Sequence, residues 1–423
     1  MAGKYSGLQA RIKQYGASAV FIPCANHSLN LVANFAAENC KNAVHYFNFL
    51  QKLYNFFSSS THRWKILTEC LKMNETPVFL KRCSATRWSA RADAVLAIKV
   101  GFKNIKEALS KICDDKDEKL ATLDEANALL KQITKHETAL MTAIWNPLLQ
   151  RINATSKSLQ TVECELLKGA ALMNSLVKFI DHFRADFANV EEGAKELSDL
   201  SSFVSEEKRV RKRKLFHEET RENEHQFCTA RDEFIVNSFY VICDNFKAQI
   251  TQRAEKYESI LEPFKVFYDW NLSLENRKKY LNILLEIYKN DIDANNLQDE
   301  LDQFLIFLKD NTELSEACVD DNKEMNVKVE LRTIYTIAKD MSCTFPNMET
   351  LLKIFLTIPI SNASGERSFS VLKRVKNYLR NSMGESKLNS LAMLYIEQDL
   401  MDELDTEKIM EEFARKKSRR KHL

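Results

Sequence analysis

The sequence Ile360-Ser-Asn-Ala-Ser-Gly-Glu-Arg-Ser-Phe-Ser-Val-Leu-Lys-Arg-Val-Lys-Asn-Tyr-Leu-Arg380 is the most informative stretch of this chain. Its apolar side chains recur every three or four residues, which predicts one stripe of an amphipathic helix. A second stripe follows a break at 381–384, where Ser382 and Glu385 have the spacing of a capping box. Both stripes need a surface to pack on. The residues predicted to form a dimer interface are Phe369, Leu372, Val375, Leu379, Leu388, Leu391, Leu394 and Tyr395.

The polar residues around these stripes have a recognisable spacing. Ser361, Ser364, Glu366-Arg367 and Phe369-Ser370 are followed by Arg380-Asn-Ser-Met-x-x-x-x-Leu-x-x-Leu. This pattern resembles the C-terminal dimerisation region of hAT-superfamily transposases, and more narrowly the branch shared with transposon-derived MYM-type zinc finger proteins. The resemblance implies a segment that completes an RNase H-like core and builds a subunit interface. It also implies that Glu366 matches the catalytic glutamate of the family.

Composition favours helices. The 423 residues include only 8 Gly and 6 Pro, so turns must be few and helices long. The formal net charge of +2 argues against a uniformly basic nucleic-acid surface and leaves only local basic clusters for such contacts.

Targeting signals and paired cysteines are both lacking in the sequence. No run reaches the ~18 to 20 apolar residues of a membrane span, and the first residues lack a signal-peptide pattern. We therefore expect a soluble, intracellular protein with no membrane partner. The ten Cys residues have no framework spacing, so we expect free thiols and no disulfides.

The N-terminal segment predicts a helix over 1–16 and then one short strand, Ala19-Val-Phe-Ile-Pro23, because this run is apolar and is bounded by Gly16 and Pro23. In hAT transposases a Cys-x-x-His pair follows the last strand of the catalytic sheet, and Cys24-Ala-Asn-His27 matches it. Residues 3–9 resemble the segment directly after the second catalytic aspartate of that family. The resemblance therefore implies that both family aspartates lie upstream of Met1.

Metal chemistry is not expected for these residues alone. Two-metal strand transfer needs several carboxylates around ions ~3.5 to 4 Å apart, and Glu366 by itself cannot hold them. We expect no metal and no cofactor, with Mg²⁺ only if an upstream catalytic half exists. For Cys24 and His27 two interpretations stay open: a buried thiol beside a hydrogen-bonded helix-start histidine, or half of a metal site.

Helical periodicity continues from 26 to about 112, and the run Lys81-Arg-Cys-Ser-Ala-Thr-Arg-Trp-Ser-Ala-Arg91 resembles the Thr-Arg-Trp motif of the family. In active relatives that tryptophan supports the reaction at the transposon end. Trp88 is accordingly either a remnant that stacks on a DNA base or a core aromatic at a helix start capped by Ser84 or Thr86. Downstream, an apolar stripe from Leu159 to Phe187 predicts one very long helix in a helical bundle.

Two basic clusters interrupt or end the helical pattern. The first, within a charged loop at about 201–225, contains Lys208, Arg209, Arg211, Lys212, Arg213 and Lys214. It is interpreted as a solvated linker, a nuclear import signal or a phosphate-contacting loop. The second, 415–421, ends a charged tail at 401–423 that we expect to be disordered.

The fold class that follows is mainly α, with a large helical insertion domain and remnants of a split RNase H-like α/β core. The expected divisions are a core remnant at 1–27, an all-helical insertion domain at 28–345, the dimerisation region at 346–400 and the tail. The retained strand and the C-terminal helices would be the core remnants.

The predicted function is a catalytically inactive hAT-derived protein that dimerises through its C-terminal helices. Its partners would be a second copy or related hAT-derived proteins, in the nucleus or otherwise in the cytoplasm. Two alternatives remain: a fragment of an active transposase whose upstream aspartates are missing, or a nuclear regulator that binds nucleic acid without sequence specificity. Specific DNA binding is not expected, since no zinc-finger module is present in this sequence.

Overall fold

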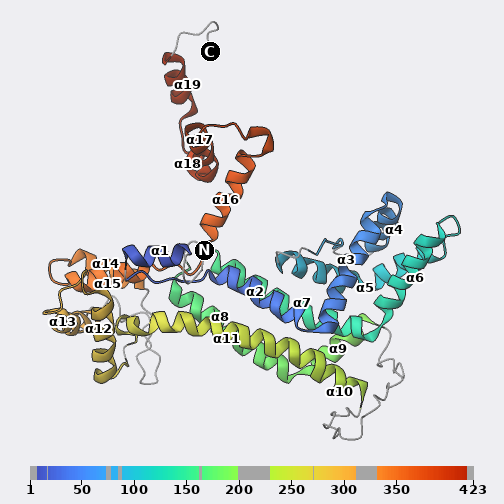
Figure 1. Ribbon diagram of the computed structural model, residues 1–423, viewed down its shortest axis with the longest axis horizontal. Coiled ribbons are helices and arrows are strands. Elements are labelled where there is room, and N and C mark those ends of the chain that lie inside the picture. Colours follow the sequence, from blue (N-terminus) through green and yellow to red (C-terminus); the bar gives the residue numbers. More distant parts are fainter. Residues whose placement is uncertain are drawn as a thin grey trace, which may run out of the picture. The chain divides into compact units, whose positions relative to one another are not determined.

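The computed structural model describes residues 7–16, 18–72, 78–83, 88–161, 164–198, 229–269, 271–310 and 331–416. Every regular element in these ranges is a helix (Figure 1), which confirms the prediction of a mainly α protein. None of the helices so described has both the length and the apolar composition that crossing a membrane requires.

The chain divides into two compact units, Met1–Ser361 and Asn362–Leu423. The helices of the first unit are α1 (Leu8–Tyr15), α2 (Ala25–Glu38), α3 (Lys41–Ser58), α4 (Thr61–Leu71), α5 (Trp88–Cys113), α6 (Leu120–Thr134), α7 (His136–Leu159), α8 (Leu166–Ala185), α9 (Phe187–Leu197), α10 (Ala230–Phe234), the π-helix η1 (Ile235–Tyr240), α11 (Val241–Leu261), the 3₁₀ helix η2 (Glu262–Phe267), α12 (Leu274–Tyr288), α13 (Leu297–Asp310), α14 (Leu331–Asp340) and α15 (Pro346–Leu356).

Long helices form the body of this unit. In Figure 1, α2, α7, α8 and α11 run side by side, and each packs on at least two of the others. The buried side chains of α2 are mostly small or branched, whereas those of α7 and α11 include aliphatic and aromatic ones. Ala25, Ala33 and Ala36 on α2 are fully buried, which lets neighbouring backbones approach closely.

An aromatic cluster fills the interior where α3, α5, α7 and α11 meet. The fully buried indole of Trp145 has its ring centroid 4.8 Å from that of Phe47 and 5.6 Å from that of Phe246. The ring of Trp88 stacks on it at 5.9 Å with an interplanar angle of 20°. These large rings remove much apolar surface from water at one place and tie four helices together.

The expected single helix through Leu159 to Phe187 is wrong. Helix α7 ends at Leu159, α8 begins at Leu166, and Asp186 separates α8 from α9. The Asp186 side chain accepts a hydrogen bond from the Asn189 backbone N–H at 3.1 Å, so it caps a new helix. The apolar stripe continued across these breaks because all three helices bury a face in the same core.

The predicted strand Ala19–Pro23 is also wrong, since residues 18–24 have no regular structure. A strand needs a neighbouring strand for its backbone groups, and the described residues contain none. Hydrogen bonds to residues far away in sequence hold this connector instead. The Tyr257 hydroxyl donates to the Pro23 carbonyl at 2.7 Å, and the Ala25 N–H donates to the Ile360 carbonyl at 3.0 Å. Burial raises the pKa of Tyr257 to about 12, so its hydroxyl keeps the proton that it donates.

A buried polar anchor sets the start of α15. Glu300 on α13 is 7% exposed, and its carboxylate accepts hydrogen bonds from the Met348 backbone N–H and from the Asn347 side-chain amide, both at 2.8 Å. The same Asn347 accepts from the Asp293 backbone N–H at 2.8 Å. Glu300 therefore supplies the acceptor that the first turn of α15 lacks within its own helix.

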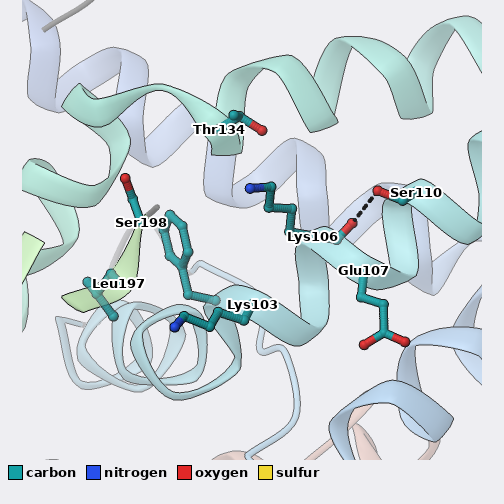
Figure 2. Close-up of a pocket in the computed structure, with 8 residues that line it drawn as sticks. Lys103, Lys106, Glu107, Ser110, Thr134, Leu197 and Ser198 are labelled. Carbon is teal, nitrogen blue, oxygen red and sulfur yellow. Dashed lines mark hydrogen bonds between the residues drawn. The ribbon is translucent and has the colours of Figure 1, made fainter. Parts of the chain in front are cut away.

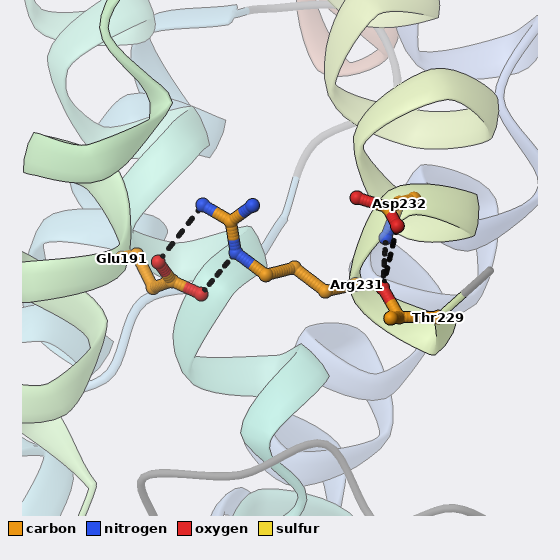
Figure 3. Close-up of polar contacts among 4 residues, drawn as sticks. All are labelled: Glu191, Thr229, Arg231 and Asp232. Carbon is orange, nitrogen blue, oxygen red and sulfur yellow. Dashed lines mark hydrogen bonds and ion pairs between the residues drawn. The ribbon is translucent and has the colours of Figure 1, made fainter.

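An ion pair joins the two helices that flank residues 199–228 in sequence (Figure 3). Arg231 on α10 donates to both carboxylate oxygens of Glu191 on α9, at 2.9 and 3.1 Å. The guanidinium also lies 5.2 Å from the ring centroid of Phe187. Thr229 caps α10 by accepting from the Asp232 backbone N–H at 3.1 Å. The helices on either side of this sequence are therefore held together by a planar, two-bond contact.

Glu191→Gln is expected to lower the free energy of unfolding by about 1 kcal/mol at neutral pH, because this pair is partly exposed. The hydrogen bond from Arg231 lowers the pKa of Glu191 from its usual 4.5, so the carboxylate is favoured in the folded state. The difference between wild type and variant should persist above pH 4.5 and shrink as the pH falls below it. Urea unfolding at several pH values measures this. The exposed neighbour Glu192→Gln is the control, and an equal, pH-independent loss in both variants would contradict the prediction.

The second unit contains α16 (Ala363–Val375), the 3₁₀ helix η4 (Tyr378–Arg380), α17 (Glu385–Ile396), α18 (Gln398–Asp402) and α19 (Thr406–Arg415). The expected disorder of 401–423 is therefore wrong for the residues of α19. The Asp405 side chain caps α19 by accepting from the Glu407 and Lys408 backbone N–H groups, at 3.1 and 3.2 Å. The composition of the tail is charged, but its apolar residues have helical spacing.

Candidate dimerisation surface

Helix α16 presents most of its side chains to solvent. Only Ala363 and Val375 are buried on it, whereas the Phe369 ring is 72% exposed. Close after the helix, Tyr378 and Leu379 are 84% and 76% exposed. Aromatic and aliphatic side chains of this size gain free energy by leaving water, so their exposure marks a surface suited to a partner.

Helix α17 packs on α16 with part of its apolar stripe. Leu388 and Leu391 are half-buried there, as is Leu372 on α16. The Arg374 guanidinium donates to the Tyr395 hydroxyl at 3.0 Å, which fixes the two helices at their far ends. No residue of α17 is buried, so this small unit has little core of its own.

The eight predicted interface residues thus divide into two groups in the second unit. One group lies toward the contact between α16 and α17 and contains Val375, Leu372, Leu388 and Leu391. The other group is exposed and contains Phe369, Leu379, Leu394 and Tyr395. Sequence periodicity finds both groups, because both are apolar at helical spacing. It cannot tell which side chains pack within one chain and which are left for another.

Further exposed apolar residues lie outside that predicted set. Their signal in the sequence is also helical spacing, most clearly Ile409, Met410 and Phe413 on one face of α19, but the surrounding charge hides it. The residues that the prediction missed are Tyr378, Met393, Ile396, Leu400, Leu404, Ile409, Met410 and Phe413, each more than 40% exposed.

Glu366, the match to the family glutamate, lies exposed in the first turn of α16. Cys24 and His27 belong to the first unit: Cys24 precedes α2 with its sulfur 3.9 Å from the Ser361 hydroxyl, and His27 is exposed on α2. Within the described ranges no group of three or more His, Cys, Asp or Glu is placed to hold a metal ion. The structure does not bring these residues together with other ligands.

Trp88 begins α5 and is 3% exposed. Its indole packs on Trp145, and the Arg91 guanidinium lies 4.3 Å from its ring centroid. A nucleic-acid base could not reach this ring without opening the aromatic cluster. The core interpretation of Trp88 is the one that the packing supports; the proposed caps Ser84 and Thr86 lie outside the described residues.

A pocket of about 310 Å³ lies between α5, α6 and α9 (Figure 2). Lys103 and Lys106 give it positive charge, but two hydroxyl groups on its wall already donate to backbone: Ser110 to the Lys106 carbonyl at 3.1 Å, and Thr134 to the Leu130 carbonyl at 2.7 Å. The remaining lining residues are Phe102, Glu107, Leu197 and Ser198. This mixture of apolar, acidic and basic groups does not define a ligand, and we assign none.

The basic candidates Lys208, Arg209, Arg211, Lys212, Arg213 and Lys214 lie outside the described residues, as does most of the second basic cluster. Their interpretation as linker, import signal or phosphate-contacting loop stays a prediction from sequence.

Comparison with curated proteins finds matches to a short part of the chain. The chain is 38% identical over 61 residues to proteins named "52 kDa repressor of the inhibitor of the protein kinase" from Mus musculus and from Homo sapiens. Each alignment covers 14% of this chain and only 8% of the relative's length. These relatives are therefore similar to a short segment and do not establish the activity of the whole chain.

A family model supplies the clearest correspondence. Residues 313–400 match the model described as the hAT family C-terminal dimerisation region, which contains all eight predicted interface residues. In the structure this range includes α14, α15 and the exposed helices α16 and α17. This part of the chain is therefore similar to the dimerisation region of hAT-family proteins.

Proposed function

We propose that this chain is a catalytically inactive, hAT transposase-derived protein whose activity is self-association through its second unit. The main observation in support of self-association is the exposed apolar surface of α16, η4 and α17. This surface lies inside the region that matches a dimerisation family. An isolated chain that leaves Phe369, Leu379 and Leu394 in water forgoes a large part of the free energy that burial would provide. Pairing with a second copy recovers it.

The exposed residues have the composition expected of an interface core. Aromatic residues and Met are enriched at protein interfaces, and the surface contains Phe369, Tyr378, Met393 and Tyr395. Large aromatic anchors of this kind typically carry most of the binding energy. Half-buried Leu388 and Leu391 would lie beneath them and support their positions.

The proposal of catalytic inactivity rests on the surroundings of Glu366. Strand transfer by a two-metal mechanism needs several carboxylates converging on one place. Glu366 is exposed on α16, and within the part of the chain that the structure describes it belongs to no cluster of potential metal ligands. Among the described residues, self-association is the activity that the surface supports best.

Phe369→Asp is expected to weaken the dimer by about 30-fold or more, the loss typical of a buried aromatic anchor. Sedimentation equilibrium of the full chain over a range of concentrations gives the dissociation constant. Tyr15→Asp is the matched control, because Tyr15 is an even more exposed aromatic, at 94%, on α1 of the first unit. A dimer that Phe369→Asp leaves unchanged, or that both variants weaken equally, would refute this placement.

We also propose a nuclear location. The run of six basic residues at 208–214 supports it, and the name of the relatives that match a short segment contains the word repressor. Microscopy of a fluorescent fusion before and after replacing Lys212 and Arg213 with Ala tests it; nuclear accumulation that persists unchanged would remove this run as the import signal.

A further inference from the structure

Charge is unevenly distributed within the second unit. Residues 362–387, here called the basic segment, contain six Lys or Arg and two Glu. Residues 397–412, here called the acidic segment, contain eight Asp or Glu and one Lys. The stretch between them, 388–396, has no charged residue. One small unit therefore carries two segments of opposite sign, separated in sequence by the uncharged residues 388–396.

The basic segment combines an exposed aromatic ring with free cations. Phe369, Lys373 and Lys376 are spaced at i, i+4 and i+7, so they follow one face of α16 and its C-cap. Neither lysine forms an ion pair with a described residue. This face offers an apolar anchor bordered by positive charge.

The acidic segment has the complementary arrangement on α18 and α19. Leu400 and Leu404 are 58% and 47% exposed, and Ile409 and Met410 are 48% and 57% exposed. The ion pairs of α19 are local and exposed, such as Lys408 with Asp405 at 3.4 Å, and contribute little. The acidic side chains without an ion pair to any described residue are Glu397, Asp399, Asp402, Glu403 and Glu407.

We propose that the basic segment of one copy binds the acidic segment of a second copy, in a twofold-symmetric dimer. This inference rests on the proposed self-association and names the surfaces that perform it. In an isologous dimer the same patch contacts occur twice, so a unit with one basic and one acidic face is complementary to itself. Phe369 and its lysines on one chain would meet the exposed aliphatic residues and carboxylates of α18 and α19 on the other.

Two observations favour a second copy over other occupants. The basic and acidic segments belong to one unit, so each copy supplies both halves of the contact at equal concentration. The acidic segment, which begins at residue 397 and runs past the end of the matched region at residue 400, would repel nucleic-acid phosphates. Helix α19 lies beyond that region, and we include it in the interface because its apolar residues Ile409 and Met410 are exposed, like Met393 and Leu394 on α17.

A charge exchange tests this pairing. One full-length variant carries Lys373→Glu and Lys376→Glu, and the other carries Asp402→Lys and Glu403→Lys. Each variant alone would place like charges together at both contacts, and its dimer should weaken at least about tenfold. Mixed in equal amounts, the variants would form a heterodimer in which both contacts again join opposite charges. Its stability should approach that of the wild-type dimer in native mass spectrometry of chains with distinct mass labels.

The controls separate this inference from the proposed function. Lys278→Glu on α12 with Lys289→Glu at its C-cap reverses two exposed lysines of the first unit and should leave the dimer unchanged. Circular dichroism should show equal helix content in all variants. If both exchange variants dimerise as wild type does, or if mixing restores no heterodimer, the pairing is overturned while self-association stands. A wild-type chain that stays monomeric would overturn both.

Discussion

Replacing Trp145 with alanine lowers the free energy of unfolding by about 3 to 5 kcal/mol, the range for deleting a fully buried aromatic side chain. Trp145 is 0% exposed and contacts Phe47, Trp88 and Phe246, which come from three other helices. Its indole N–H is buried with no hydrogen-bond partner among the described residues, so the loss is one of packing. Urea unfolding followed by circular dichroism measures it.

Trp64→Ala is the matched control for this prediction. Trp64 on α4 is only partly buried and has one aromatic neighbour in the described part of the chain, Tyr54, at a centroid distance of 6.3 Å. Its loss should be clearly smaller than that of Trp145. Equal losses at the two positions would mean that the cluster around Trp145 is not the centre of the first unit.

Glu300→Ala should lower the free energy of unfolding by about 2 to 4 kcal/mol, because it leaves two buried donors without an acceptor. These are the Met348 backbone N–H and one N–H of the Asn347 side-chain amide, whose nitrogen also donates to the Asp293 carbonyl at 3.2 Å. The adjacent Asp299→Ala is the control, since Asp299 is exposed in the first turn of the same helix. Chemical unfolding compares the two, and a loss at Glu300 no greater than at Asp299 would show that α15 does not depend on this cap.

The pH dependence of Glu300 distinguishes it from Glu191. Burial raises the pKa of Glu300, so the folded state favours the protonated carboxyl. Relative to Glu300→Gln, wild-type stability should therefore rise as the pH falls toward 4.5 and be lost as the pH rises through the raised pKa. Glu191 should show the opposite trend, because its pKa is lowered. Unfolding of both Gln variants over one pH series measures the two trends, and trends of the same sign would contradict the assignment.

Glu300 also connects the region that matches the dimerisation family to α13, the helix that precedes this region in sequence. Residues 313–400 include α15, yet the carboxylate that caps α15 comes from α13, which precedes the region. The start of α15 therefore depends on a residue of α13, which lies outside the matched region. A fragment cut at residue 313 would lack this acceptor, and its α15 would start with exposed or unpaired donors.

Several elements could be predicted from residue spacing because spacing reports which side of a helix faces apolar surroundings. Helical periodicity predicts helices from 26 to about 112, and within that range Ile98, Phe102, Ile105, Leu109 and Ile112 are all buried on α5. The two linked helices around 363–396 were expected from the same signal. The apolar period of a helix involves only residues that are close in sequence, so it predicts helices of this length without any knowledge of distant contacts.

Other features could not be predicted because they depend on distant partners. An apolar run such as Ala19–Pro23 forms a strand only where another strand can pair with it, and here Tyr257 and Ile360 hold the connector instead. Trp88 became a core residue through Trp145 and Arg91, which come from α7 and from one turn further along α5. Nothing in the Thr-Arg-Trp spacing reveals those contacts.

The sequence by itself determined that this protein is helical and that its C-terminal part carries amphipathic helices matching a dimerisation family. Few glycines and prolines and a regular apolar period are enough to predict the helices, whereas the spacing of the polar residues around Glu366 carries the resemblance to the dimerisation family. Only the tertiary structure decided which apolar side chains remain in water, because exposure depends on what the rest of the chain covers. Leu391 and Phe369 are both among the eight residues predicted for the interface. In the structure Leu391 is half-buried against α16, whereas Phe369 is exposed and left for a partner.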